Sequence, residues 1–296
     1  MSTCTVVLPR VSRAWAYLIL AKPDVTFLVV LTTAAGFYLG LRGPFLPAPF
    51  IHAIVGTLLI AAGTSALNQC IEREDDAMMR RTARRPLPLG VLQLPKALAF
   101  GCGMVVLGAA YLALLVNALA CALGVATCLS YLAAYTPLKK RTAWATFVGA
   151  FPGAVPPLIG WAAARSSLGL EAWVLFAILF VWQFPHFYAI AWIYREDYTR
   201  AGIRMLSVGD TSGEATFRQI LAFAAVLVPV GMLPAALGMT GILYFFGAMM
   251  LGLAQLQVAI WSSRSRSNHS AKWLMHATVI YLPVLLGLMA FDKISR

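Results

Sequence analysis

The sequence predicts an all-α, polytopic membrane protein: nine transmembrane helices that form a single domain over residues 1–296. Hydrophobic residues make up 60% of the chain and charged residues only 11%, which is too little charge to cover a soluble domain of this length. The apolar segments are long and continuous, which is typical of spanning helices and not of the alternating strands of a membrane barrel. The chain is therefore expected to be integral to the membrane and to contact lipid.

Nine segments are close to the length of about 20 residues that a helix needs to cross a bilayer. They are residues 25–41, 51–67, 97–116, 119–134, 143–162, 172–192, 220–237, 242–261 and 274–291. The stretch before the first segment, through Ser12, has no long apolar core and no clear cleavage site, so the first segment is expected to act as the insertion signal. The short connection at Asn117 predicts that the third and fourth segments form an antiparallel hairpin.

The net charge of +12 is distributed unevenly, and this distribution argues against nucleic-acid binding. With nine spans, only four of the 23 basic residues lie on one face of the membrane, namely Arg42, Arg165, Lys293 and Arg296. By the positive-inside rule the opposite face, with the N-terminus, is cytoplasmic. The five cysteines form neither a metal-binding pattern nor a plausible disulfide set.

The first candidate site follows the second segment and reads NQCIEREDDAMMRRTARRPLP. If that helix continues past the membrane face, Asn68, Glu72 and Asp76 line one side of it. Such oxygen ligands suit Mg²⁺, whereas Glu74 and Asp75 point elsewhere and are expected to be solvated. Four arginines come next, at Arg80, Arg81, Arg84 and Arg85. Carboxylates followed by guanidinium groups predict a site for a metal–diphosphate complex; an ordinary cytoplasmic loop of mixed charge is the alternative.

The second candidate site, YTPLKKR, ends the fourth segment. Tyr135 and Lys139 are four residues apart, and the Lys139 ammonium can reach a diphosphate as a point charge. Anchoring at the membrane interface, which both residue types favour, is the alternative.

The third candidate site follows the sixth segment, where Asp197 comes after its helix much as Asp76 comes after the second. A second carboxylate facing the first could hold a second metal ion. Tyr194 lies close to Asp197 in the sequence and is a candidate for substrate binding.

Two spans carry features that are unusual in a membrane helix. Gln183 and His186 lie within the sixth segment, where polar residues are candidates for substrate binding; they could equally satisfy the backbone carbonyl that Pro185 frees. The fifth segment contains FPGAVPPLIGW, whose three prolines and two glycines predict an internal cavity or close helix packing around Gly149 and Gly153.

Together these motifs resemble the intramembrane prenyltransferases of the UbiA superfamily, and within it the branch of the protohaem IX farnesyltransferases, or haem O synthases. The similarity covers most of the chain, and RTARRPLP combined with WQFPHF is typical of the haem branch. The resemblance implies nine helices around a central cavity, farnesyl diphosphate as donor, haem b as acceptor and Mg²⁺ as cofactor. It also implies the inner membrane of a bacterial cell, with terminal oxidase assembly or haem A synthase as partners.

The resemblance assigns roles by position. Catalytic roles are implied for Asn68, Glu72, Asp76, Lys139 and Asp197, of which all but Lys139 are also expected to bind metal. Substrate-binding roles are expected for Arg80, Arg81, Arg85, Tyr135, Tyr194, Gln183 and His186. The chain departs from the family pattern at three places: Glu72 replaces an aspartate, Ile193 stands four residues before Asp197 where a second aspartate is expected, and Arg204 replaces a common proline.

Two other functions are compatible with the sequence. One is a prenyltransferase of the same superfamily that acts on 4-hydroxybenzoate or another quinone precursor. The other is a membrane carrier or transporter, because broken helices and buried polar residues also mark transport paths. The acidic residues gather at one face of the membrane and not near its midplane, which favours the enzyme.

Overall fold

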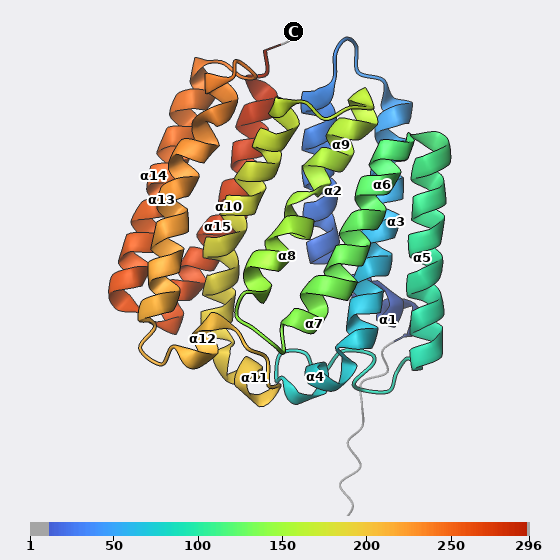
Figure 1. Ribbon diagram of the computed structural model, residues 1–296, viewed down its shortest axis with the longest axis vertical. Coiled ribbons are helices and arrows are strands. Elements are labelled where there is room, and N and C mark those ends of the chain that lie inside the picture. The colour runs from blue at the N-terminus through green and yellow to red at the C-terminus, as the bar shows by residue number, and fades with distance from the viewer. Residues whose placement is uncertain (1–11, 295–296) are drawn as a thin grey trace, which may run out of the picture.

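The computed structural model describes residues 12–294, and in this part of the chain nearly all regular structure is helical (Figure 1). Within it, nine helices are long and apolar enough to cross a membrane. They run side by side in one bundle. The nine predicted spans are confirmed. Cys4 and Arg10, on the N-terminal segment predicted to be cytoplasmic, and Arg296 lie outside the described residues.

Six spans are single continuous helices longer than the bilayer core requires, and three depart from this pattern. The continuous ones are α3 (Pro47–Ile71), α5 (Leu94–Leu115), α10 (Leu170–Ile193), α13 (Glu214–Ala236), α14 (Ile242–Ser265) and α15 (Asn268–Phe291). The shorter first span is α2 (Pro23–Gly40). The fourth is built from α6 (Ala118–Leu129), a π-helical turn (Ser130–Tyr135) and α7 (Thr136–Leu138), and the fifth from α8 (Ala145–Ala154) and α9 (Pro156–Arg165).

Helix α15 starts several residues before the apolar segment that predicted it. The Ser267 hydroxyl accepts a hydrogen bond from the Ser270 backbone N–H at 3.1 Å, and Ser270 reciprocates in a capping box. Such a cap satisfies amide groups that the first turn would leave unpaired. Polar caps of this kind extend a helix into the interface, where hydropathy alone cannot detect it.

The fifth span breaks between α8 and α9, as its prolines predicted. Pro156 and Pro157 have no N–H to donate to the preceding turn. The glycines in this span allow close packing: a Cβ on Gly149 would lie 2.5 Å from the Tyr135 ring, and one on Gly153 would lie 2.0 Å from Gln183 Oε1. The prediction of close packing around these two glycines is confirmed.

The third and fourth spans form the predicted antiparallel hairpin at Asn117 (Figure 1). The Asn117 side chain caps α6 by accepting from the Ala120 backbone N–H at 2.8 Å, and it donates to the Ala162 carbonyl at 2.8 Å. The Asn117 side chain therefore caps the helix that follows the turn and also links the hairpin to α9.

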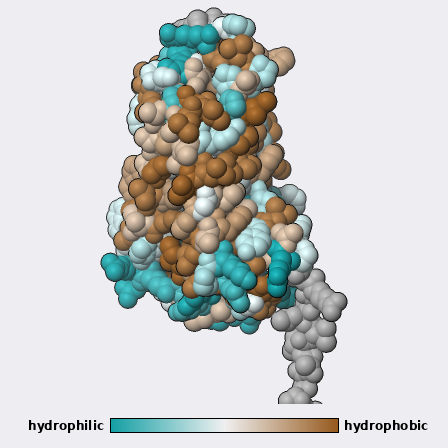
Figure 2. All heavy atoms as spheres, turned by 90° about the vertical axis from the view of Figure 1, so that its right-hand side faces the viewer, coloured by the Kyte–Doolittle hydropathy of each residue, from teal (hydrophilic) through white to brown (hydrophobic). Residues whose placement is uncertain are grey.

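The face of the bundle seen in Figure 2 carries an apolar belt between two more polar ends. Large apolar side chains such as Leu114, Ile242 and Phe291 are among the most exposed, which is expected where lipid is the solvent. Four short helices lie outside the spans: α1 (Arg13–Leu20), α4 (Arg73–Met78), α11 (Arg195–Arg200) and α12 (Leu206–Gly209). The last three lie together at one end of the bundle, which we call the acidic end (Figure 1).

Candidate active site

The first acidic motif spans the end of α3 and the short helix α4 that follows it. The helix is interrupted only at Glu72, whose N–H still bonds to the Asn68 carbonyl at 2.9 Å and whose carbonyl accepts from the Asp76 N–H at 2.8 Å. Asn68, Glu72 and Asp76 are therefore one turn apart, as predicted. Asn68 and Asp76 are each only 1% exposed, so this side of the motif faces the protein.

Asn68 joins three segments of the chain. Its Oδ1 accepts from Lys22 Nζ at 2.8 Å, and its Nδ2 donates to Thr136 Oγ1 at 3.2 Å. Burial, with the nearby Arg85 charge, lowers the pKa of Lys22 to about 7. Lys22 was not among the predicted site residues. The sequence feature that could have identified it is a basic residue directly before Pro23, where the first span begins. In the structure its backbone is left-handed (φ 47°), a conformation that non-glycine residues seldom adopt.

Glu72 and Lys139 form an ion pair of 2.7 Å, and both side chains are largely buried. Burial acts to raise the pKa of Glu72, but the Lys139 ammonium outweighs it and lowers that pKa. Burial likewise opposes the charge on Lys139, yet the adjacent Tyr135 ring and the Glu72 carboxylate raise the pKa of Lys139 well above its usual value. The ammonium lies 4.5 Å from the Tyr135 ring centre. The structure thus brings the Tyr135–Lys139 pair to the first acidic motif.

Asp76 is held from the loop that follows it. Its Oδ2 accepts from Arg85 Nη1 at 2.7 Å, and its backbone carbonyl accepts from Thr82 Oγ1 at 3.0 Å. Its Oδ1 is buried and has no hydrogen-bond partner in the described chain. A buried carboxylate oxygen without a partner is costly, so this atom is a place where a cation or a donor from a substrate would be stabilising.

The oxygen donors around Asp76 fit a magnesium ion. Mg²⁺ uses one or two protein carboxylates and completes its shell with water and substrate phosphates, and Glu72 and Asp76 supply that number. Within residues 12–294, no group of three or more His, Cys, Asp or Glu side chains is arranged to hold a metal by itself. The donor set therefore suits an ion that shares its shell with a phosphate group.

Asp197 connects the two acidic motifs. Its Oδ1 and Oδ2 accept from the backbone N–H groups of Arg80 and Arg81, each at 3.2 Å, and Oδ1 is also paired with the Arg200 side chain. The second motif therefore lies directly against the loop of the first. These donors were not predicted, and they occupy the carboxylate that was expected to bind metal. The structure does not test the metal-binding role expected for Asp197.

The arginines after the first motif separate into two groups. Arg85 belongs to the buried cluster with Asp76, whereas the side chains of Arg80, Arg81 and Arg84 are exposed. The Arg81 guanidinium lies 4.9 Å from the Tyr194 ring centre, so Tyr194 also contacts the loop of the first motif.

Asp75 corrects one expectation. It was expected to be solvated together with Glu74, but it is only 6% exposed and its Oδ1 lies 2.7 Å from Lys140 Nζ. Glu74 is exposed, as expected. Residue 75 is buried because the loop after α7 packs against a second side of α4, a contact between distant segments that helix periodicity does not reveal.

Gln183 and His186 contact neighbouring helices. Gln183 Nε2 donates to the Ala150 carbonyl at 3.1 Å and to the Leu179 carbonyl at 3.0 Å. His186 Nδ1 lies 2.8 Å from Thr278 Oγ1 on α15, with its ring stacked on Trp182. None of these contacts involves the Val181 carbonyl, the one that Pro185 frees, so they do not match the structural alternative as predicted; the substrate-binding roles of both residues stay predictions.

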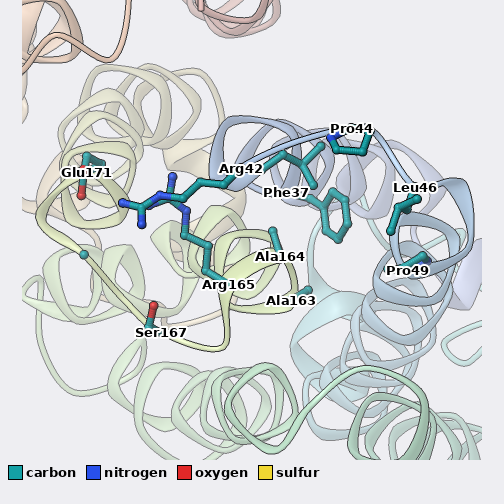
Figure 3. A pocket seen from close by; sticks show the side chains of 12 residues that line it. Phe37, Arg42, Pro44, Leu46, Pro49, Ala163, Ala164, Arg165, Ser167 and Glu171 are labelled. Atoms are coloured by element: carbon teal, nitrogen blue, oxygen red, sulfur yellow. The ribbon is translucent and has the colours of Figure 1, made fainter. Parts of the chain in front are cut away.

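The expected central cavity also stays a prediction. A pocket of about 590 Å³ lies at the end of the bundle opposite the acidic motifs, where Arg42 and Arg165 line it (Figure 3).

Comparison with known sequences gives one consistent result. The model of the UbiA prenyltransferase family matches residues 29–282. A protoheme IX farnesyltransferase from Solibacter usitatus is 48% identical over 94% of this chain and 98% of its own, and one from Koribacter versatilis is 45% identical over 93% and 92%. A mitochondrial protoheme IX farnesyltransferase from Arabidopsis thaliana is 36% identical over 96% of this chain and 66% of its own.

Solved structures show the same fold at low sequence identity. A digeranylgeranylglyceryl phosphate synthase superposes with a TM-score of 0.77 at 16% identity, over 94% of this chain and 97% of its own. A UbiA homologue from Archaeoglobus fulgidus bound to GPP and Mg²⁺ superposes with a TM-score of 0.65 at 14% identity, over 93% and 99%. The arrangement of nine spanning helices is thus the fold of these proteins.

Proposed function

Because the chain belongs to the UbiA prenyltransferase family, we propose that it transfers the farnesyl group of farnesyl diphosphate to a vinyl group of haem b, forming haem O with Mg²⁺ as cofactor. The names of its similar relatives support the acceptor and the farnesyl donor. The archaeal homologue bound to GPP and Mg²⁺ supports a prenyl diphosphate and a divalent ion for this fold.

One observation carries the proposal: a largely buried group of ionisable side chains at the acidic end in which basic groups outnumber acids. Lys22, Arg85 and Lys139 surround Glu72 and Asp76, and Asp76 keeps one oxygen unpaired. Burying charged groups is costly unless they are paired. An excess of basic groups, together with an unpaired carboxylate oxygen, is therefore suited to a ligand that combines a metal ion with a strongly anionic group, as a diphosphate does.

The side chains act on the leaving group. Mg²⁺ bound at Asn68, Glu72 and Asp76 would neutralise part of the diphosphate charge and weaken the allylic C–O bond. Lys139 and Arg85 are already held by their carboxylate partners, so they stabilise the negative charge that grows on the diphosphate with little reorganisation. When that bond breaks, its electron pair leaves with the diphosphate.

The acceptor then supplies the new bond. The π electrons of the haem vinyl group form a C–C bond to farnesyl C1, and water adds to the resulting cation and loses a proton, which leaves a hydroxyethylfarnesyl side chain. The apolar interior of the bundle delays the access of water until the C–C bond has formed.

We also propose the orientation of the protein in the membrane and its cellular location. The excess of Lys and Arg at the acidic end supports a cytoplasmic location for that end and for the N-terminus, and the bacterial relatives support the inner membrane of a bacterial cell. Haem O formation would link the protein to terminal oxidase assembly or to haem A synthase.

The proposal is tested by incubating the purified protein with radiolabelled farnesyl diphosphate, Mg²⁺ and either haem b or 4-hydroxybenzoate. We expect label in the haem fraction only, and the mass of haem O in haem extracted from cells that express the chain. Label on 4-hydroxybenzoate would instead assign the protein to the quinone branch, and label on neither acceptor would contradict the proposed activity.

A further inference from the structure

The pocket opposite the acidic end is a separate site. It lies where α2 and α9 end and α10 begins (Figure 3). Helix α2 has 18 residues, so at about 1.5 Å per residue roughly 27 Å separates its two ends. The volume of about 590 Å³ falls within the range of roughly 300–1,000 Å³ that is usual for small-molecule sites. A ligand here would lie at the opposite membrane interface.

The pocket has a charged half and an apolar half. Figure 3 shows the guanidinium groups of Arg42 and Arg165 pointing toward one another on the side of Glu171. The rest of the wall is mainly apolar and includes Phe37, Pro44, Leu46, Pro49, Ala163 and Ala164. Such a pocket suits an amphiphile and not a fully polar solute.

The Arg165 guanidinium is held in place without a counterion, and the exposed Arg42 guanidinium lies beside it. Arg165 Nε donates to the Gly40 carbonyl, and its guanidinium lies 4.6 Å from the Trp161 ring centre. Glu171 lines the same pocket, yet neither arginine forms an ion pair in the part of the chain from 12 to 294. Neighbouring like charges repel each other, so a bound anion would stabilise this arrangement.

The surrounding charge adds to this effect. Of the four basic residues on this face, Arg42, Arg165 and Lys293 line a smaller adjoining pocket. Lys293 Nζ donates to the carbonyls of Tyr38 and Leu41 at 2.7 and 3.0 Å. Positive charge is thus concentrated at one place on a face that is otherwise poor in it.

We propose that this pocket binds the phosphodiester of a membrane phospholipid, with Arg42 and Arg165 on the phosphate and the apolar half against the acyl chains. Guanidinium groups bind phosphate oxygens in pairs. Two arginines and Glu171, with Lys293 in the adjoining pocket, leave two net positive charges, which favours the binding of an anion such as a phosphodiester. Phospholipid phosphates also lie at this depth of the membrane. The site does not depend on the proposed farnesyl transfer.

The test measures lipid binding to the delipidated protein in detergent. A short-chain phosphatidylglycerol is titrated and followed by native mass spectrometry, with inorganic phosphate as a competitor in a parallel series. Arg42→Gln is the test variant because its side chain makes no hydrogen bond in the described structure, so the fold should be retained. Arg264→Gln removes an equally exposed arginine from the other end and is the matched control.

We expect Arg42→Gln to weaken phosphatidylglycerol binding by about tenfold or more, as loss of a charge-assisted hydrogen bond predicts, and Arg264→Gln to bind like the wild type. Arg42→Lys keeps the charge but not the paired donors, and we expect a smaller loss. Unchanged affinity in Arg42→Gln would overturn the proposal, and so would displacement of the lipid by an equal concentration of inorganic phosphate, which would indicate a site for a free anion.

Discussion

Asp76 shows at the level of one residue why the acidic end is proposed as the active site. Its two carboxylate oxygens have different environments: Oδ2 is paired with Arg85, and Oδ1 is buried and unpaired. A purely structural carboxylate would be expected to have both oxygens satisfied. This asymmetry motivates a direct test of metal dependence.

We predict that Asp76→Asn lowers turnover by about 100-fold or more, which is the usual loss when one group that stabilises transition-state charge is removed. The same substitution should raise the Mg²⁺ concentration required for half-maximal rate. Initial rates measured against Mg²⁺ concentration check this. Glu74→Gln removes an exposed carboxylate of the same motif and should leave both quantities unchanged. Normal turnover of Asp76→Asn at saturating Mg²⁺ would remove this residue from the metal site.

Asp197 is expected to act differently, because its oxygens hold the backbone of Arg80 and Arg81. We predict that Asp197→Asn loosens this loop and raises KM for the diphosphate severalfold, while the Mg²⁺ requirement stays that of the wild type. Rates measured over both concentrations separate the two effects. A Mg²⁺ requirement that shifts as strongly as in Asp76→Asn would make Asp197 the second metal ligand.

At the scale of elements, α2 and α9 pack closely because both present glycines. A Cβ on Gly160 would lie 1.9 Å from the Thr33 carbonyl oxygen, and one on Gly36 would lie 2.1 Å from the Pro157 carbonyl oxygen. Backbone cannot yield as a flexible side chain can, so the two helices would have to separate. This packing connects the first span, which follows Lys22, to the broken fifth span.

We predict that Gly36→Ala destabilises the folded protein by about 1–3 kcal/mol, the usual cost of overpacking, and lowers its melting temperature in detergent. Gly103 lies within α5 with open space around it. Gly103→Ala should therefore be neutral or stabilising by up to about 1 kcal/mol, because alanine favours the helix. Equal melting temperatures for the two variants would contradict the close packing of α2 on α9.

The start of α13 provides a pH-dependent contribution to stability. The Asp210 carboxylate accepts from the Thr216 backbone N–H at 2.7 Å. Partial burial acts to raise the pKa of Asp210, but this hydrogen bond, together with those from Ala215 and Ser212, outweighs it and lowers the pKa below its usual value. A group whose pKa is lowered in the folded state contributes stability above its unfolded pKa, about 3.9, and loses it as the pH falls through the folded pKa.

We therefore predict that Asp210→Asn lowers the melting temperature at pH 7, by a stability loss of under about 1 kcal/mol because the site is partly exposed to solvent. The difference from the wild type should shrink as the pH falls below about 4. Melting curves over this pH range check the prediction, with Glu214→Gln in the same helix as control. A difference that is independent of pH would show that the carboxylate charge is not the cause.

At the scale of the whole molecule, the two ends of the bundle differ in chemistry: carboxylates and most of the basic residues lie at one end, and the arginine-lined pocket lies at the other (Figures 1 and 3). This polarity supports the proposed orientation, in which the diphosphate would be bound and released on the cytoplasmic side.

We predict that a membrane-impermeant maleimide labels Ser167→Cys in intact cells, and labels Arg84→Cys only after the membrane is permeabilised. Both positions are exposed, at opposite ends of the bundle. A background in which Cys4 is replaced by Ser removes the cysteine that precedes the first span. Labelling of Arg84→Cys in intact cells would reverse the orientation.

The sequence by itself determined that the chain lies in lipid, where its nine spans are, and how the first acidic motif is spaced. Composition alone excludes a soluble domain, and the turn-by-turn spacing of Asn68, Glu72 and Asp76 is a local property of the chain that needs no knowledge of its neighbours. The hairpin at Asn117 and the break before Pro156 were predictable for the same reason, because each is local in the chain.

Only the tertiary structure decided which distant residues complete the site. Lys22 meets Asn68, Lys139 meets Glu72, and Asp197 receives the backbone of the Arg80 loop; each contact depends on how separate helix ends come together. The same holds for the pairing of Arg42 with Arg165 and for the burial of Asp75. Helical periodicity specifies which side of a helix a residue faces, but the partner on that side is set by packing between segments that are far apart in the chain.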